Sequence, residues 1–70
     1  MTLTQAIHAG RANRFKVYQS SEGVHMVWDL LTNKARLPIK TSASEGAPSA
    51  ALANFADAYR EVMTLNGGNN

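Results

Sequence analysis

The two histidines are the residues of this chain best suited to acid–base or metal chemistry, because imidazole titrates near neutral pH and binds transition metals. His8 and His25 lie far apart in the sequence, and neither belongs to a run with metal-site spacing. Asp29 follows His25 by four residues, which gives two possible ligands where a zinc site needs at least three. We therefore expect no metal site and interpret both histidines as solvated or packing residues.

The carboxylates, serines and glycines also lack the patterns of catalytic sites. Asp57 and Glu61 are one helical turn apart, but Arg60 lies beside them, and an exposed, solvated helix surface explains them better than a buried acid–base pair. No serine lies in a GxSxG motif, and the glycines form no phosphate-binding pattern. Cysteine is absent, which excludes thiol catalysis and cysteine-bound metals. We expect no catalytic residue and no cofactor, and hence a protein that is not an enzyme.

Length and composition restrict the class of protein further. Seventy residues form one small domain, which buries only about 60% of its unfolded surface and is marginally stable. No apolar run approaches the roughly 20 residues of a membrane span, and the first residues do not resemble a signal peptide. Small secreted domains usually carry disulfides, so the lack of cysteine favours a cytoplasmic protein that does not contact membranes.

The periodicity of apolar residues predicts an α+β domain with the element order helix, three strands, helix. Thr2 and Gln5 have the spacing of a capping box, which predicts a short helix over residues 3–9 before Gly10. The alternative is that residues 1–13 form an extended arm. At the other end, Pro48 suits a first helical turn, so we expect a loop over 41–47, a helix over 48–65 and a frayed tail over 66–70. The helix is predicted to cover the sheet with an apolar stripe formed by Leu52, Phe55, Tyr59, Val62 and Met63.

Residues 14–40 are predicted to form a three-stranded antiparallel meander with turns near Gly23 and Asn33. Pro38 has no N–H to donate, which makes the third strand an edge strand. Matching apolar residues across the strands predicts the opposed pairs Phe15–Trp28, Val17–Met26, Trp28–Leu37 and Met26–Ile39. In this register the apolar residues share one face, and Trp28 becomes the centre of the core.

The charges are unevenly distributed along the chain. Residues 1–43 carry six basic and two acidic residues, a net +4, whereas residues 44–70 carry one basic and three acidic residues, a net −2. The predicted register places a basic surface with one aromatic residue on the open face of the sheet, with Asp29 between two of the arginines. This surface consists of Arg14, Lys16, Tyr18, Arg36 and Lys40. Cations that hold phosphates and an aromatic ring that stacks on a base are typical of nucleic-acid binding.

In the order of its elements, three strands followed by a helix over about residues 14–65, the chain resembles the arm-binding domain of phage integrases and the AP2-type plant domain. These domains lay their sheet in a DNA groove. The resemblance lies in element order alone, and no family motif matches residue by residue. It implies that the four basic residues of this surface contact phosphates or base edges while Tyr18 stacks.

A protein-interaction module is the alternative, such as a small phage- or plasmid-type inhibitor or adaptor, or a homodimer. Val27 and Leu31 point out of the sheet in the predicted register, and exposed apolar residues at the centre of a sheet often mark a contact surface. The N-terminal helix could instead cover them. Unpaired edge strands offer a second route to a partner.

Overall fold

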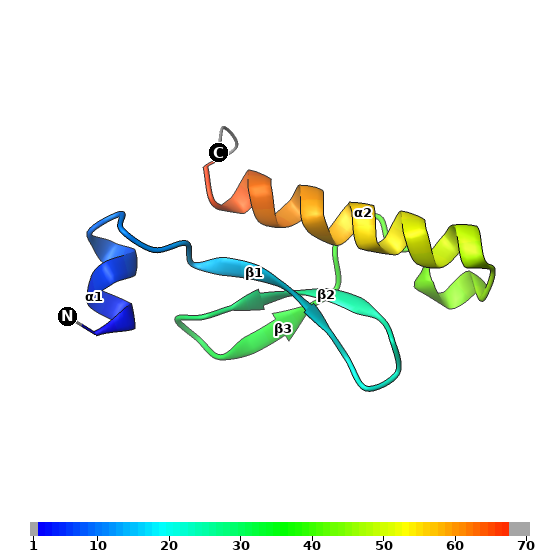
Figure 1. Ribbon diagram of the computed structural model, residues 1–70, viewed down its shortest axis with the longest axis horizontal. Coiled ribbons are helices and arrows are strands. Elements are labelled where there is room, and N and C mark those ends of the chain that lie inside the picture. Colours follow the sequence, from blue (N-terminus) through cyan, green and yellow to red (C-terminus); the bar gives the residue numbers. More distant parts are fainter. Residues whose placement is uncertain (1, 68–70) are drawn as a thin grey trace.

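The computed structural model describes residues 2–67 and has the α+β architecture that the sequence predicts. In chain order its elements are α1 (Leu3–His8), β1 (Phe15–Gln19), β2 (His25–Asp29), β3 (Lys34–Arg36), a 3-10 turn η1 (Ala43–Glu45) and α2 (Pro48–Leu65). The strands form one antiparallel sheet in the order β1-β2-β3, and α2 lies across one face of it (Figure 1). One helix on one thin sheet gives an elongated molecule of 42 × 26 × 14 Å.

The short N-terminal helix forms with the capping box that the sequence predicts. The backbone N–H of Gln5 donates to Thr2 Oγ1 at 3.1 Å, and the N–H of Thr2 donates to Gln5 Oε1 at 2.8 Å. Gly10 follows the helix with φ +73°, a conformation that glycine adopts without strain. No residue of α1 is buried, and the helix projects beyond one end of the sheet (Figure 1). It therefore covers neither face.

The two turns of the meander form near Gly23 and Asn33, as predicted, but the first loop is one residue longer than the predicted register implies. Gln19 pairs with His25, so the first loop has five residues, Ser20 to Val24, and contains Gly23 at φ +85°. Asp29 pairs with Lys34, and Asn33 takes a positive φ of 56° in the second loop. The second and third strands are shorter than expected, because pairing ends at Asp29 and at Arg36.

The predicted strand register is wrong. Between β1 and β2 the pairs are one residue away from those expected, with Phe15 opposite Asp29 and Val17 opposite Val27. An odd shift turns every side chain of one strand to the other face relative to its neighbour. Between β2 and β3 the shift is two residues, which sets Trp28 opposite Ala35 and leaves the faces of that pair unchanged. One extra residue in the first loop thus rearranges the side chains on both faces of the sheet.

The long helix begins at Pro48, as predicted, but its inward side is not the predicted one. The stripe that was expected to cover the sheet is largely exposed: Leu52 is 74%, Phe55 45% and Tyr59 53% accessible. The side that meets the sheet is small or polar and consists of Ala50, Asn54, Ala58 and Glu61. Because Ala50 and Ala58 are small, they do not hold the helix away from the sheet. The side chains of Asn54 and Glu61 can therefore reach the backbone of β2 and of the segment after β3.

Three polar side chains connect the helix to the sheet, two from its inward side and one from the residue that follows its last turn. Asn54 accepts a hydrogen bond from the backbone N–H of His25 at 2.7 Å and donates to its carbonyl at 3.1 Å. Asn66, just after the helix, makes the same two bonds with the backbone of Phe15, both at 3.0 Å. Glu61 accepts from the backbone N–H of Ile39 at 3.1 Å. The helix is therefore held by hydrogen bonds to the backbone of β1, β2 and the segment after β3.

The apolar core is small. Among the described residues, the buried apolar side chains are Val27 at the centre of β2, Pro38 after β3, and Ala50 and Ala58 on α2. Trp28, the expected centre of the core, points away from the helix and is only partly buried. A domain with so little buried apolar surface depends on its polar contacts more than most.

Candidate functional site

The two faces of the sheet differ in what covers them. Val27 is 1% exposed beneath α2, so its neighbours on the strand, Met26 and Trp28, point to the opposite side. Residues directly across the sheet from these two share that side. We call this surface the outer face, and it consists of Lys16, Tyr18, Met26, Trp28 and Ala35.

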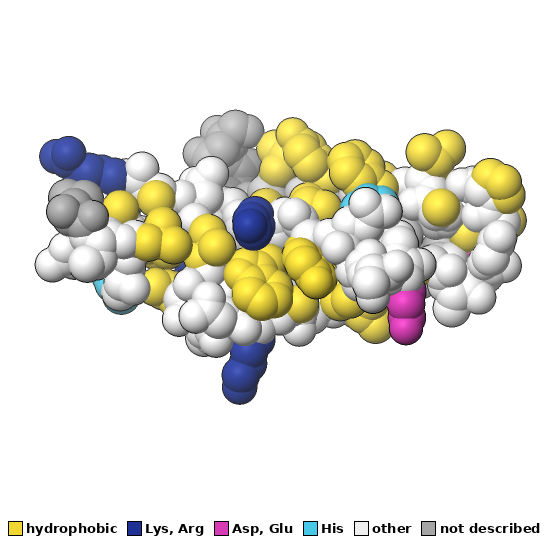
Figure 2. All heavy atoms as spheres, turned by 60° about the horizontal axis from the view of Figure 1, so that its bottom comes forward, with side chains coloured by type: hydrophobic (Ala, Val, Ile, Leu, Met, Phe, Trp, Pro, Cys, Tyr) yellow, Lys and Arg dark blue, Asp and Glu magenta, His cyan; other side chains and the backbone are white. Residues whose placement is uncertain are grey.

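Two aromatic rings in contact form the centre of the outer face. Tyr18 and Trp28 are diagonal neighbours on adjacent strands, with ring centroids 5.3 Å apart and planes tilted by 40°. Lys16 lies directly across from Trp28, and Met26 lies directly across from Tyr18. Figure 2 turns this side toward the reader and shows hydrophobic side chains gathered over the sheet, with only scattered charges around them. The outer face is thus mainly apolar and aromatic, with one lysine.

An open groove of about 670 Å³ adjoins the outer face. Its apolar residues are Val24, Met26 and Leu37, and Leu37 is 55% exposed. The remaining lining is polar and small: Ser20, Ser21, Glu22, Thr41, Ala43 and Ser44. A groove lined by both apolar side chains and hydroxyl groups can accept an apolar side chain and hydrogen-bond the backbone that carries it.

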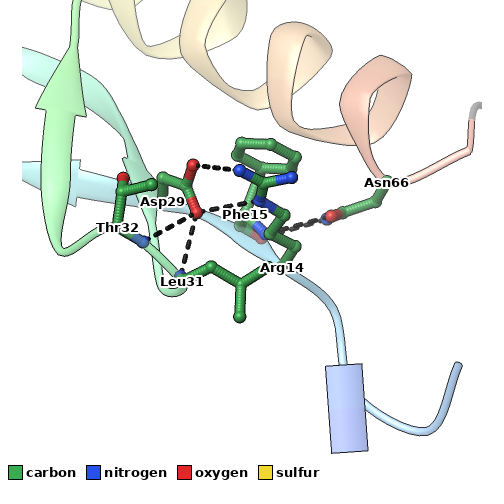
Figure 3. Close-up of polar contacts among 6 residues, drawn as sticks. All are labelled: Arg14, Phe15, Asp29, Leu31, Thr32 and Asn66. Carbon is green, nitrogen blue, oxygen red and sulfur yellow. Dashed lines mark hydrogen bonds and ion pairs between the residues drawn. The ribbon is translucent and has the colours of Figure 1, made fainter. Parts of the chain in front are cut away.

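Arg14 forms a bidentate ion pair with Asp29 and does not lie on the open face of the sheet. Its Nε donates to Asp29 Oδ1 at 3.0 Å and its Nη2 donates to Asp29 Oδ2 at 2.8 Å (Figure 3). Asp29 Oδ1 also accepts from the backbone N–H groups of Leu31 and Thr32. The guanidinium lies 5.1 Å from the centre of the Phe15 ring, within the range of a cation–π contact.

This network favours the charged form of both partners. The hydrogen bonds from Arg14 hold the pKa of the Asp29 carboxyl well below its usual range, and the backbone N–H groups of Leu31 and Thr32 act in the same direction. The hydrogen bond to Asp29 likewise raises the pKa of Arg14. The pair therefore stays ionised throughout the physiological pH range and fixes the turn after β2.

Arg36 and Lys40 also lie away from the outer face. Arg36 is opposite Val27 and donates from Nη2 to Glu61 Oε1 at 3.0 Å, on the side that α2 covers. Lys40 follows β3 and lines a separate hollow of about 230 Å³ beside α2, together with Asp57 and Glu61. The predicted basic surface is therefore not assembled on one face: Lys16 and Tyr18 share the outer face, and Arg14, Arg36 and Lys40 do not. Asp29 contacts Arg14 alone of the two arginines expected to flank it.

The alternative surface, Val27 and Leu31, is not formed as expected. Val27 is buried beneath α2, because the one-residue shift of register turns it toward the helix. Leu31 follows the end of β2 in the second loop and is partly buried. The large exposed apolar residues on and just after the described strands are Tyr18 on β1 and Leu37 and Ile39 after β3.

The remaining candidates for chemistry do not converge. No group of three or more metal-binding side chains occurs within residues 2–67. Glu61, expected on the exposed side of the helix, is 9% exposed, whereas Asp57 lies near Arg60 at 3.9 Å. The ring of His25 packs edge-on against Phe55, and its Nδ1 is buried without a hydrogen-bond partner in the described part of the chain. These side chains contribute to packing between α2 and the sheet.

Sequence reasoning placed Trp28, Met26 and Leu37 in the core and so did not identify them as candidate contact residues. One signal for the true arrangement is present in the helix, where Ala50, Asn54 and Ala58 recur at intervals of four. A stripe of alanines with one asparagine is typical of a helix that approaches its neighbour closely. Recognising that stripe as the inward side would have left the large apolar residues outside.

Comparisons with known proteins identify no relative of this chain. None of the helices described here combines the length and the apolar character needed to cross a membrane. No protein-family model, no curated protein and no solved structure matches this chain.

Proposed function

We propose that the protein is a non-enzymatic binding module that contacts another protein through its outer face. The observation that carries the proposal is the pair of touching rings, Tyr18 and Trp28, on the face of the sheet that no helix covers. Tyrosine, tryptophan and methionine are enriched at the centres of protein interfaces, where large rings bury much area with little loss of side-chain freedom. Leu37 and the adjoining groove extend this apolar surface.

The partner that suits this surface is a protein segment with exposed apolar side chains. Tyr18 and Leu37 can bury such side chains against their own, while the serine and threonine hydroxyls that line the groove can hydrogen-bond backbone groups. Lys16 offers one positive charge at the edge of the ring pair, which favours a carboxylate on the partner at that point.

Nucleic-acid binding receives less support from the same geometry. Arg14 and Arg36 each bind a carboxylate, so two of the four predicted phosphate contacts are already neutralised within the chain. Lys16 is then the one cation beside the ring pair among the outer-face residues. Affinity for nucleic acid rises with the number of phosphates neutralised, and one lysine contributes little.

The test is a selection from a displayed library of random peptides against the immobilised protein, with a pool of labelled single- and double-stranded oligonucleotides titrated in parallel. We expect selected apolar peptides whose affinity falls at least about tenfold in Leu37→Glu and in Tyr18→Glu. The matched control is Leu52→Glu, which places the same charge on an exposed leucine of α2 and should leave peptide binding unchanged.

Two results would overturn the proposal. The first is oligonucleotide binding that weakens steeply with salt and is lost in Lys16→Ala, which would assign the outer face to nucleic acid. The second is a set of peptides whose binding is insensitive to Leu37→Glu and Tyr18→Glu, which would place the contact surface elsewhere. Trp28 is the single tryptophan of the chain, so its fluorescence reports directly on binding at this face.

A further inference from the structure

The side of α2 that faces away from the sheet carries a continuous apolar stripe. Leu52, Phe55 and Tyr59 are spaced by three and four residues, and Val62 continues the pattern. The rings of Phe55 and Tyr59 are stacked with centroids 6.3 Å apart, which makes one flat patch of the two side chains. We call this surface the outer stripe. Leu52 and Tyr59 are more than half exposed, and Phe55 remains 45% exposed although the ring of His25 contacts it from the sheet.

We propose that the outer stripe packs against the same stripe of a second copy of this chain, with the two helices antiparallel about a two-fold axis. The alternating spacing of three and four is the spacing of helix pairs that interlock along their length. An antiparallel two-fold arrangement centred between Phe55 and Tyr59 sets Phe55 of each copy against Tyr59 of the other. Leu52 then meets Val62, so that each large side chain faces another apolar one.

The distribution of charge along α2 suits a copy of itself better than a charged partner. The charged residues of the helix, Asp57, Arg60 and Glu61, all lie off the outer stripe, toward the sheet or to one side. Two identical stripes can therefore meet without like charges coming together, which any self-pairing requires. Ala56 lies at the edge of the stripe and is small. It therefore allows the two helix axes to approach to about 8–10 Å, which is typical of packed helices.

The small core gives a second, independent reason for a second copy. Four buried apolar side chains within residues 2–67 make a small core, and domains of this size commonly gain stability by associating. A copy of the same chain is present wherever the chain itself is made. The dimer adds the apolar burial that the monomer lacks, and it adds it on the side of the helix that the monomer leaves open.

The area of the stripe fits a small dimer interface. Side chains of this size present roughly 150–250 Å² when fully exposed, so the three exposed ones leave on the order of 300 Å² uncovered on each copy. A standard interface buries about 800 Å² per partner. The stripe thus forms the apolar centre, and the flanking side chains along the 18-residue helix supply the rim. Buried area does not fix affinity, so the dissociation constant has to be measured over a wide range of concentration.

The test is the molar mass in solution, measured by sedimentation over about 1 to 500 µM, a range that spans micromolar dissociation constants. We expect the mass to rise with concentration from 7.6 kDa toward twice that value. Leu52→Glu, at a residue 74% exposed in the monomer, should raise the dissociation constant at least about thirtyfold, because the two-fold axis places the charge in the interface twice. Leu52→Ala should raise it by a smaller factor. Far-UV circular dichroism checks that both variants stay folded.

Two matched controls keep this inference separate from the proposed function. Ser49→Glu introduces the same side chain on the same helix but off the stripe, and Leu37→Glu introduces it beside the outer face; both should dimerise like the parent chain. A chain that stays monomeric at the highest concentration overturns the dimer. A dimer that persists in Leu52→Glu, or that is lost in Leu37→Glu, overturns its placement on α2. A monomeric chain, or a dimer that persists in Leu52→Glu, leaves the peptide-binding test unaffected, whereas a dimer lost in Leu37→Glu would place self-association beside the outer face.

Discussion

The inner and outer sides of α2 reverse the usual relation between burial and hydrophobicity. The inner side buries Asn54 at 1% exposure and Glu61 at 9%, between alanines, whereas the outer side exposes Leu52, Phe55 and Tyr59. A helix normally turns its largest apolar residues toward the core. Here its orientation follows the hydrogen-bonding needs of the strands beneath it. Backbone groups left unpaired by a short sheet can therefore decide which side of a helix faces inward.

The need for those hydrogen bonds arises at a particular place in the sheet. Val27 pairs with Arg36, so continuing the same register would set Pro38 opposite His25. Proline has no N–H and cannot donate to a strand. Asn54 supplies both a donor and an acceptor to the His25 backbone instead, and Asn66 does the same for Phe15 on β1. The side-chain amides thus take the place of neighbouring strand residues.

The largest effect is expected from removing the buried amide of the inner side. Asn54→Ala leaves the N–H and C=O of His25 without their partners and also removes the 2.6 Å bond to Thr41 Oγ1. Unsatisfied buried polar groups cost about 1–3 kcal/mol each, so the free energy of unfolding should fall by about 3 kcal/mol. That is a large fraction of the ~4–10 kcal/mol usual for a chain of this length. Urea denaturation followed by circular dichroism measures the change.

The matched control for this experiment is Asn13→Ala, in the exposed segment before β1, which should change the unfolding free energy by less than about 0.5 kcal/mol. Equal effects of the two substitutions would show that the amide of Asn54 is not what holds α2 to β2.

Much of this fold follows from the sequence, and the inner side shows why the rest does not. The element order, the capping box of Thr2 and Gln5, and the helix start at Pro48 are local features that propensity and capping predict. The register depends on a single residue in the first loop, and apolar matching favoured the shorter loop because it placed Phe15 opposite Trp28. The helix orientation depends on hydrogen bonds between residues far apart in the sequence, which periodicity does not report.

The next effect in size concerns the buried carboxylate of the inner side. Glu61→Ala removes the acceptor for the backbone N–H of Ile39 and for the guanidinium of Arg36. Arg36 is half-exposed and regains water, so the main cost is the Ile39 N–H, and we expect a loss of about 2 kcal/mol in urea denaturation. Arg36→Ala should cost less, because Glu61 then still accepts from Ile39. The matched control is Arg60→Ala. Arg60 is exposed and lies 3.9 Å from Asp57, so its removal should change the free energy of unfolding by less than about 0.5 kcal/mol.

A third effect is the response to acid of Asp29, the carboxylate at the end of β2. The pKa of Asp29 is lowered in the folded chain by Arg14, so at acidic pH the unfolded chain binds more protons than the folded one at this group. Its contribution to stability is complete above the unfolded pKa of about 4 and is lost as the pH falls further. Asp29→Asn should therefore flatten the dependence of unfolding free energy on pH between about 5 and 2. Asp57→Asn serves as the matched carboxylate control, and a pH profile unchanged by Asp29→Asn would contradict the assignment.

The candidate site was less predictable than the fold, for a physical reason that the same residues make plain. Tyr18 and Lys16 were placed on the open face correctly, since alternation within β1 does not depend on its neighbour. Arg14 and Arg36 were expected beside them. Whether residues of different strands lie on the same face depends on the register between those strands. Their carboxylate partners are Asp29 at the end of β2, 15 residues from Arg14, and Glu61 on α2, 25 residues from Arg36. Pairing over such distances is settled by the tertiary structure.

The smallest effect is expected where a sequence-based interpretation would place the largest. Leu52→Ala in a core would cost about 2–5 kcal/mol, yet Leu52 is 74% exposed on the outer stripe of α2. At a concentration where the chain is monomeric, the free energy of unfolding should change by less than about 0.5 kcal/mol. At a concentration that favours association, the parent chain should become more stable than the variant, because a dimer stabilises the folded state by mass action. Urea denaturation at the two concentrations measures both quantities. A loss of several kcal/mol at low concentration would show that Leu52 packs inside the monomer, and the contrast between the two sides of the helix would fail.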